Sequence, residues 1–355
     1  MANDNGSSFV ATASAAESGA PAGSPGGAPA RRAAGRGVDI QRFATLGFFL
    51  VFFLVVAAIK GSVFLSVDNV ILTLGQNAHL AFVAAAATIT LIAGQFDLSV
   101  GAVAGLAATL VAGFTSIQQL PVIPAILLTV VIGALAGLVN GLLVTKLNIN
   151  AFIATLASAS AIGGVALIYA NNQIIYNGIP EALTTPGKFE ILHVPLPVFY
   201  AGALLFLGWG LTRHTVLGRF WYAVGANPEA ARLAGVNVGR MTMWALVTAG
   251  TVAAIGGVIM TARFGSADPT TGPGLLLPAY AAAFLGSSIL SDGKFTVVGT
   301  IIATFLVAFA QNGIDVLGLS AGVKPIFNGF VLAAAVALSE GLRRRGRRLV
   351  RSGSR

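Results

Sequence analysis

Long apolar stretches, separated by short polar or charged segments, occupy most of the chain from Phe43 to residue 341. An α-helix needs about 20 largely uncharged residues to cross the hydrocarbon core of a bilayer. The pattern therefore predicts an all-α, polytopic membrane helix bundle of about ten transmembrane or re-entrant helices, with eight full spans as the smaller alternative. The predicted helices are 43–65, 70–94, 98–117, 121–145, 149–171, 194–212, 239–262, 275–291, 295–317 and 322–341.

Prolines and small residues refine this pattern. The uncharged run 98–145 is too long for one crossing, and Pro121 and Pro124 divide it. The stretch 275–291 is short and Pro278 lies near its start, so a re-entrant segment and a full crossing both remain open. Glycines recur at four-residue spacing, a pattern that lets helix backbones approach closely in lipid; they are Gly101, Gly105, Gly133, Gly137 and Gly141.

Composition excludes a soluble globular protein. Of the 355 residues, 56% are hydrophobic and only 9% are charged, with a mean hydropathy of +0.85. A soluble domain carries roughly a quarter of its residues as Asp, Glu, Lys and Arg. The shortage leaves too little polar surface to cover a soluble globule.

The positions of the basic residues predict the topology. Basic clusters beside apolar spans are typical of cytoplasmic ends, and an even number of spans places both termini on that side. Lys146 and the cluster between Arg213 and Arg240 then lie inside, and the polar connection 172–193 lies outside. Nucleic acid is not an expected partner, because that needs a basic face rather than basic ends. The end residues are Arg31, Arg32, Arg36, Arg42, Arg343, Arg344, Arg345, Arg347, Arg348, Arg351 and Arg355.

Three regions follow from these patterns. Residues 1–38 are mostly Ala, Gly, Ser and Pro and predict a disordered cytoplasmic tail, because they cannot bury enough apolar surface to fold. Residues 39–342 form the predicted transmembrane domain, and 343–355 a basic cytoplasmic tail.

The cytoplasmic segment 218–240 is the most informative connection. Asn227 is a good N-cap, Pro228 suits the first helical position, and Glu229 complements the helix dipole. An ordinary connecting turn is the plainer interpretation, but such turns are usually far shorter. We therefore expect a short rigid helix suited to docking a partner that moves the flanking spans. Its candidate residues are Gly225, Asn227, Pro228, Glu229, Ala230, Ala231, Arg232 and Gly235.

The run Glu229-Ala230-Ala231, followed after three residues by Gly235, resembles the EAA-type loop of permeases in ATP-binding-cassette importers, although the Leu-Pro that ends many such loops is absent. Four further blocks resemble the ribose-type monosaccharide permease family. They are FDLSVGAVAGLAATLVAG at 96–113, NGLLVTKLNINAFIATLAS at 140–158, GSADPTTGPGLLLPAYAAAFLGSS at 265–288 and QNGIDVLGLS at 311–320. These blocks are spread in order along residues 40–340.

The resemblance implies a permease subunit that forms the pathway for a monosaccharide in a bacterial inner membrane. Its implied partners are an ATPase subunit docked on the 227–235 helix, a periplasmic or lipoprotein sugar-binding protein, and a second permease copy in a homodimer. ATP and Mg are expected on the ATPase subunit, with no cofactor on this chain. The chain itself is not expected to be an enzyme, because it lacks the Gly-x4-Gly-Lys-Ser/Thr phosphate loop.

Polar residues inside apolar stretches are candidates for the pathway or its gate, because such groups should face protein or water rather than lipid. Asp97 has two interpretations, a cap at a helix start or a group in the translocation path. Asparagine and threonine suit a neutral sugar, although packing between helices explains them as well. The candidates are Gln76, Asn77, His79, Asp97, Ser99, Asn140, Asn150, Phe152 and Thr155.

Other functions were weighed against this prediction. A permease of the same superfamily for a nucleoside or a branched-chain amino acid is the nearest alternative. An ion-coupled secondary transporter would need buried carboxylates or charge pairs in mid-membrane, and the spans contain almost none. An intramembrane enzyme would need a His/Ser, His/Glu or paired-Asp arrangement, and no pattern predicts a metal site.

Overall fold

A computed structural model describes residues 32–290 and 293–352. The described chain is almost wholly helical, with one two-stranded hairpin in which Glu190 pairs with Pro195. The elements are α1 (Arg32–Phe64), α2 (Val67–Ile92), α3 (Val100–Ser116), α4 (Val122–Thr145), α5 (Ala151–Tyr169), α6 (Glu181–Lys188), β1 (Glu190–Ile191), β2 (Val194–Pro195), α7 (Leu196–His214), α8 (Val216–Ala226), α9 (Pro228–Leu233), α10 (Val238–Phe264), α11 (Gly272–Leu290), α12 (Val297–Val316) and α13 (Val323–Ser352).

The all-α membrane bundle predicted from hydropathy is confirmed. Among the described residues, eight helices are long and apolar enough to cross a membrane. Two shorter apolar helices, Val100–Ser116 and Val323–Ala337, complete the set of ten predicted elements. The stretch around Pro278 forms a single helix, α11, which begins at Gly272 and contains the proline rather than being broken by it.

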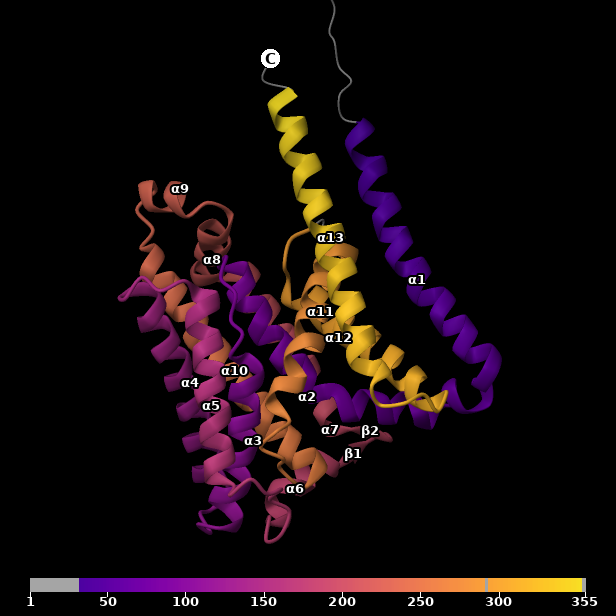
Figure 1. Ribbon diagram of the computed structural model, residues 1–355, viewed down its shortest axis with the longest axis vertical. Helices are drawn as coiled ribbons and strands as arrows, with labels where there is room; N and C mark the ends of the chain where they lie inside the picture. Colours follow the sequence, from indigo (N-terminus) through magenta and orange to yellow (C-terminus); the bar gives the residue numbers. More distant parts are fainter. Residues whose placement is uncertain (1–31, 291–292, 353–355) are drawn as a thin grey trace, which may run out of the picture.

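The two ends of the bundle differ in character (Figure 1). The start of α1, the end of α13 and the helices α8 and α9 lie at one end of the molecule. The short helix α6 and the β1–β2 hairpin lie at the opposite end. This arrangement agrees with an even number of crossings between the two termini.

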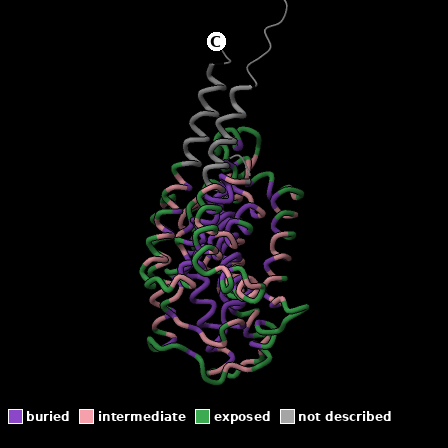
Figure 2. Tube along the Cα trace, turned by 90° about the vertical axis from the view of Figure 1, so that its right-hand side faces the viewer, coloured by how far each residue is buried: buried purple, intermediate pink, exposed green. Residues whose placement is uncertain are grey.

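The bundle has a small-residue core surrounded by more exposed helices. Buried positions run through the middle of the bundle (Figure 2), mainly on α2, α3, α10 and α11. The glycines at four-residue spacing allow the backbones of neighbouring helices to approach closely. A side chain at Gly101 would come within 2.6 Å of the Gly272 oxygen, and one at Gly141 within 2.9 Å of the Met243 side chain. These glycines therefore pack helices within one chain.

The first and last helices extend into both predicted tails. Residues 32–38 belong to α1, although the composition assigns them to the tail, and α13 continues to Ser352 through most of the predicted tail 343–355. Residues 1–31 and 353–355, the rest of both predicted tails, lie outside the described residues.

Candidate functional site

The helix expected at 227–235 is present as α9, and its caps are those that the sequence predicts. The Asn227 side-chain oxygen accepts hydrogen bonds from the Glu229 and Ala230 amides at 3.1 Å each. Pro228 occupies the first turn. Gly235 closes the helix with φ +85°, a left-handed conformation that favours glycine, and its amide donates to the Arg232 oxygen at 3.0 Å. Helix α9 is thus held at both ends.

A second helix, α8, precedes α9, and the sequence pattern did not predict it as a separate element. Thr215 caps it by accepting a hydrogen bond from the Gly218 amide at 3.1 Å. Trp221 is fully buried and donates from Nε1 to the Met241 oxygen of α10 at 3.0 Å. The Tyr222 hydroxyl donates to the Phe295 oxygen at 2.8 Å, which joins α8 to the α11–α12 connection. The aromatic pair Trp221-Tyr222 was the feature of the sequence that could have indicated a separate, packed helix here.

The end of α8 also contacts the turn between α2 and α3. Gly225 and Gly94 face each other across this contact, and a Cβ placed on Gly94 would lie 3.1 Å from the Gly225 Cα. A Cβ placed on Gly225 would clash with the Ile92 oxygen. Helix α8 is therefore attached to the ends of three other elements, which makes it a rigid base for α9.

Most of α9 and its flanking residues are exposed. Ala231 is buried at 6% exposure, whereas Leu233 is 91% exposed. Glu229 and Arg232 are exposed on the same short helix. The arrangement presents a small apolar and charged surface on a fixed support, the geometry expected of a docking element.

Four of the polar candidates come together in a buried cluster that we call the Asp97 cluster: Asp97, Ser99, Asn140, Thr155 and, in addition, Tyr280. All five are at most 4% exposed. The Asp97 carboxylate accepts hydrogen bonds from the Ser99 amide at 2.9 Å and the Ser99 hydroxyl at 2.6 Å. The Asn140 amide group donates to the Ser99 hydroxyl at 2.8 Å.

The cluster extends to α5 and α11 through the backbone of the α2–α3 turn. The Thr155 hydroxyl accepts from the Leu98 amide at 3.0 Å. The Tyr280 hydroxyl accepts from the Asp97 amide at 2.9 Å and donates to the Asp97 oxygen at 3.0 Å. Sequence reasoning missed Tyr280, because an aromatic residue in an apolar helix is usually ordinary core.

Asp97 is not the N-cap of α3: that position is Ser99, which makes no side-chain cap hydrogen bond. The Asp97 carboxylate instead accepts the Ser99 amide and hydroxyl, which holds the turn that precedes the helix. The Asn140 side-chain oxygen is buried without a hydrogen-bond partner in the structure. A buried amide oxygen without a partner is energetically costly.

The remaining candidates lie apart from this cluster. Gln76 is exposed on α2, and the Asn77 side chain donates to the Thr73 oxygen of its own helix at 2.9 Å. His79 is buried edge-on to Phe264 with ring centroids 5.7 Å apart, and its Nδ1 has no partner. Asn150 caps α5 by accepting from the Phe152 amide at 2.9 Å, while the Phe152 ring is half exposed. In the part of the chain that the structure describes, no three His, Cys, Asp or Glu residues are grouped to hold a metal ion.

Comparisons with known proteins identify the family of this chain. A family model described as branched-chain amino acid transport system / permease component matches residues 69–336. The ribose import permease protein RbsC of Bacillus subtilis (strain 168) is 36% identical over 82% of this chain and 90% of its own. RbsC of Escherichia coli (strain K12) is 34% identical over 77% of this chain and 86% of its own.

Relatives with other names match at similar levels. The galactofuranose transporter permease protein YtfT of Escherichia coli (strain K12) is 37% identical over 74% of this chain and 76% of its own. The autoinducer 2 import system permease protein LsrD of Enterobacter sp. (strain 638) is 32% identical over 72% and 80%. No solved structure matches. The chain is therefore a transport subunit rather than an enzyme. It belongs, together with the ribose import permeases, to the family of permease components that the branched-chain amino acid transport system model describes.

Proposed function

We propose that this permease carries a monosaccharide and is driven by a separate ATP-binding-cassette ATPase subunit that docks on α9. The observation that carries the proposal is an exposed, doubly capped helix on a base that is tied to other helices. An ATPase pushing on α9 displaces α8, and α8 contacts the α2–α3 turn, α10 and the α11–α12 connection. ATP and Mg belong to that partner, and this chain supplies no cofactor.

The end of the bundle with α8 and α9 is assigned to the cytoplasm, and both termini with it. The basic residues Arg213, Arg219, Arg232 and Arg240 gather at this end, as the positive-inside rule requires. The opposite end, with α6 and the hairpin, then faces a periplasmic or lipoprotein sugar-binding protein. A second copy of the permease completes the pathway in a homodimer, in the bacterial inner membrane.

The names of the relatives support a sugar as cargo. These relatives are named as permeases for ribose, galactofuranose and autoinducer 2. The family description favours a branched-chain amino acid as the second candidate, with a nucleoside as a third. An uptake panel of a pentose, a hexose, leucine and uridine in proteoliposomes separates these cargoes.

We propose two groups of residues for the pathway and its gate. The Asp97 cluster is closed to solvent, so we assign it to the cytoplasmic gate rather than to an open channel. Gln76, Asn77 and His79 on α2, and Asn150 and Phe152 at the start of α5, are the candidates for contact with the sugar. A cysteine-accessibility scan of 148–156 tests whether these residues face the pathway. Because the chain contains no cysteine, no native thiol interferes with the labelling.

Affinity purification of the tagged chain from its native membranes tests the docking helix. We expect an ATPase subunit to co-purify and to be lost when Glu229 and Arg232 are both replaced by alanine. The matched control replaces Glu181 and Lys188, the charges of α6 at the other end of the bundle. A permease that retains the ATPase after both α9 replacements, or that never retains one, contradicts the proposal.

A further inference from the structure

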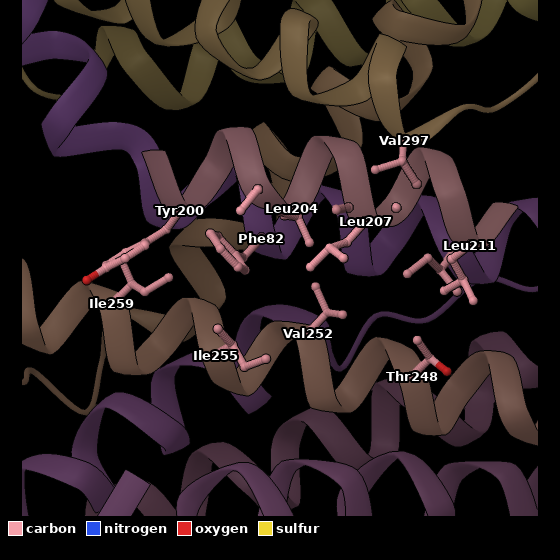
Figure 3. Close-up of a pocket in the computed structure, with 14 residues that line it drawn as sticks. Phe82, Tyr200, Leu204, Leu207, Leu211, Thr248, Val252, Ile255, Ile259 and Val297 are labelled. Atoms are coloured by element: carbon pink, nitrogen blue, oxygen red, sulfur yellow. The ribbon is translucent and has the colours of Figure 1, made fainter. Parts of the chain in front are cut away.

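The apolar groove between α7 and α10 does not suit a sugar. It holds a cavity of about 490 Å³ over a floor formed by α2 (Figure 3). The side chains drawn along it are hydrocarbon apart from the hydroxyls of Tyr200 and Thr248. A sugar that entered it would lose most of its hydrogen bonds to water without gaining others. The route of the sugar therefore lies in another part of the bundle.

The α2–α3 turn, residues 93–99, is recessed from the end of the bundle where α8 lies. The Asn140 side chain donates to the Ser99 hydroxyl at 2.8 Å, from position 140 of a helix that ends at 145. The Thr155 hydroxyl accepts from the Leu98 amide at 3.0 Å, at position 155 of a helix that begins at 151. At 1.5 Å per residue, α4 and α5 extend about 6–8 Å beyond the turn.

This recess places non-helical backbone at the depth of the hydrocarbon core. Helix α5 has 19 residues and is about 28 Å long, no more than the core itself, so a point about 6 Å from its start lies within the core. Irregular backbone at this depth is tolerated only where it is buried in protein or lines a water-filled cavity.

The two halves of the turn satisfy this condition in different ways. Asp97 and Ser99 are each 1% exposed and are thus buried in protein. Gly94 is exposed, and because it has no side chain its exposed surface is backbone. Phe96 is 44% exposed beside it. The stretch 94–96 therefore faces water rather than lipid.

The Phe96 ring is held on one side and open on the other. It stacks on Tyr280 with centroids 6.1 Å apart and an interplanar angle of 10°, and on Phe284 at 6.4 Å and 24°. Phe284 in turn packs edge-on against Phe295 at 5.1 Å. The Tyr280 hydroxyl also bonds to the amide and the carbonyl oxygen of Asp97, the next residue in the turn. These contacts fix the position of a large apolar side chain at the edge of a wet space.

We propose that residues 94–96 line the aqueous pathway of the permease near the α8 end, and that the Phe96 ring narrows it. Phe96 touches the passing sugar, whereas Tyr280 and Phe284 are positioning residues that act through its ring. The inference rests on the role of the chain as a permease. It depends neither on the docking of an ATPase on α9 nor on the identity of the sugar.

Thiol labelling tests whether the turn faces water. Gln95→Cys places one thiol in a chain that has no other, at a half-buried position that leaves the Phe96 ring intact. Phe206→Cys is the control, because Phe206 lies within the span α7 and is 70% exposed, as a lipid-facing side chain is. The reagent is a trimethylammonium methanethiosulfonate, supplied to both faces of open membrane fragments.

We expect Gln95→Cys to react about fiftyfold faster than Phe206→Cys, since the hydrocarbon core excludes a charged group by roughly this factor. Equally slow reaction at both positions would show that the turn faces lipid or a second copy of the chain, and the proposal fails.

A leak assay tests whether the ring narrows the pathway. Proteoliposomes that contain the permease are loaded with radiolabelled sorbitol, a small neutral polyol, and no ATP is added. Phe96→Ala should release sorbitol several times faster than wild type. Phe96→Tyr keeps the ring and should retain sorbitol, as should Phe206→Ala on α7.

Retention of sorbitol by Phe96→Ala, or an equal leak from Phe206→Ala, overturns the narrowing role. Gln95→Cys still tests the lining of the pathway if Phe96→Ala does not fold. Co-purification of an ATPase is scored separately on the same variants. A failure of docking on α9 is thereby distinguished from a failure of this site.

Discussion

Replacement of Gly225 by alanine adds one methyl group at the contact between α8 and the α2–α3 turn. The added Cβ would clash with the Ile92 oxygen and lie 3.0 Å from the Gly94 nitrogen. All of these are backbone atoms, which cannot move aside as the end of a flexible side chain can. Overpacking of this kind costs about 1–3 kcal/mol.

A matched control isolates this steric cost. Gly239 also lies in a helix at the same end of the bundle, but a Cβ there would meet its nearest atoms only at 3.8 Å. Both Gly→Ala changes gain similar helix propensity, up to about 1 kcal/mol. The free energies of unfolding of the two variants should therefore differ by about 1–3 kcal/mol, with Gly225→Ala the less stable.

Thermal unfolding in detergent and ATP-driven uptake in proteoliposomes measure the two consequences. Because the caps of α9 are unchanged, Gly225→Ala should still bind the ATPase while it transports less sugar per ATP hydrolysed. Gly239→Ala should behave as wild type in both assays. If Gly225→Ala unfolds and transports like the Gly239 control, the close contact does not transmit motion and the reasoning is refuted.

Three further changes test the cap and the Asp97 cluster. Asn227→Ala removes the cap of α9 and should cost about 0.5–2 kcal/mol of local stability, seen as faster hydrogen exchange at residues 229–231; unchanged exchange would contradict it. Tyr280→Phe leaves the Asp97 amide without its partner and should lower stability by about 1–3 kcal/mol, whereas an unchanged unfolding temperature would show that the pair contributes nothing. Asp97→Asn keeps an acceptor oxygen for Ser99, so membrane level and uptake should both persist if Asp97 only holds the turn before α3. Loss of uptake at a normal membrane level would show a role in transport.

Hydropathy and local propensity account for much of the fold. Ten apolar stretches become ten helices because a bilayer leaves the backbone no other partners than its own carbonyls. The α9 helix was equally predictable, since Asn227, Pro228 and Gly235 act on their own neighbours in the chain. Such signals act between residues close in sequence, so they can be recognised without knowledge of the tertiary structure.

Contacts between distant residues were decided by packing. Tyr280 meets Asp97 across 183 positions, and Trp221 reaches Met241 from a helix that the hydropathy pattern does not separate from its neighbours. Pro278 illustrates the same limit, because a helix buried among α2, α3 and α12 keeps its course through a residue that breaks isolated helices. The apolar groove between α7 and α10 likewise exists only because those helices stand apart over α2, and no pattern within any one of them encodes that separation.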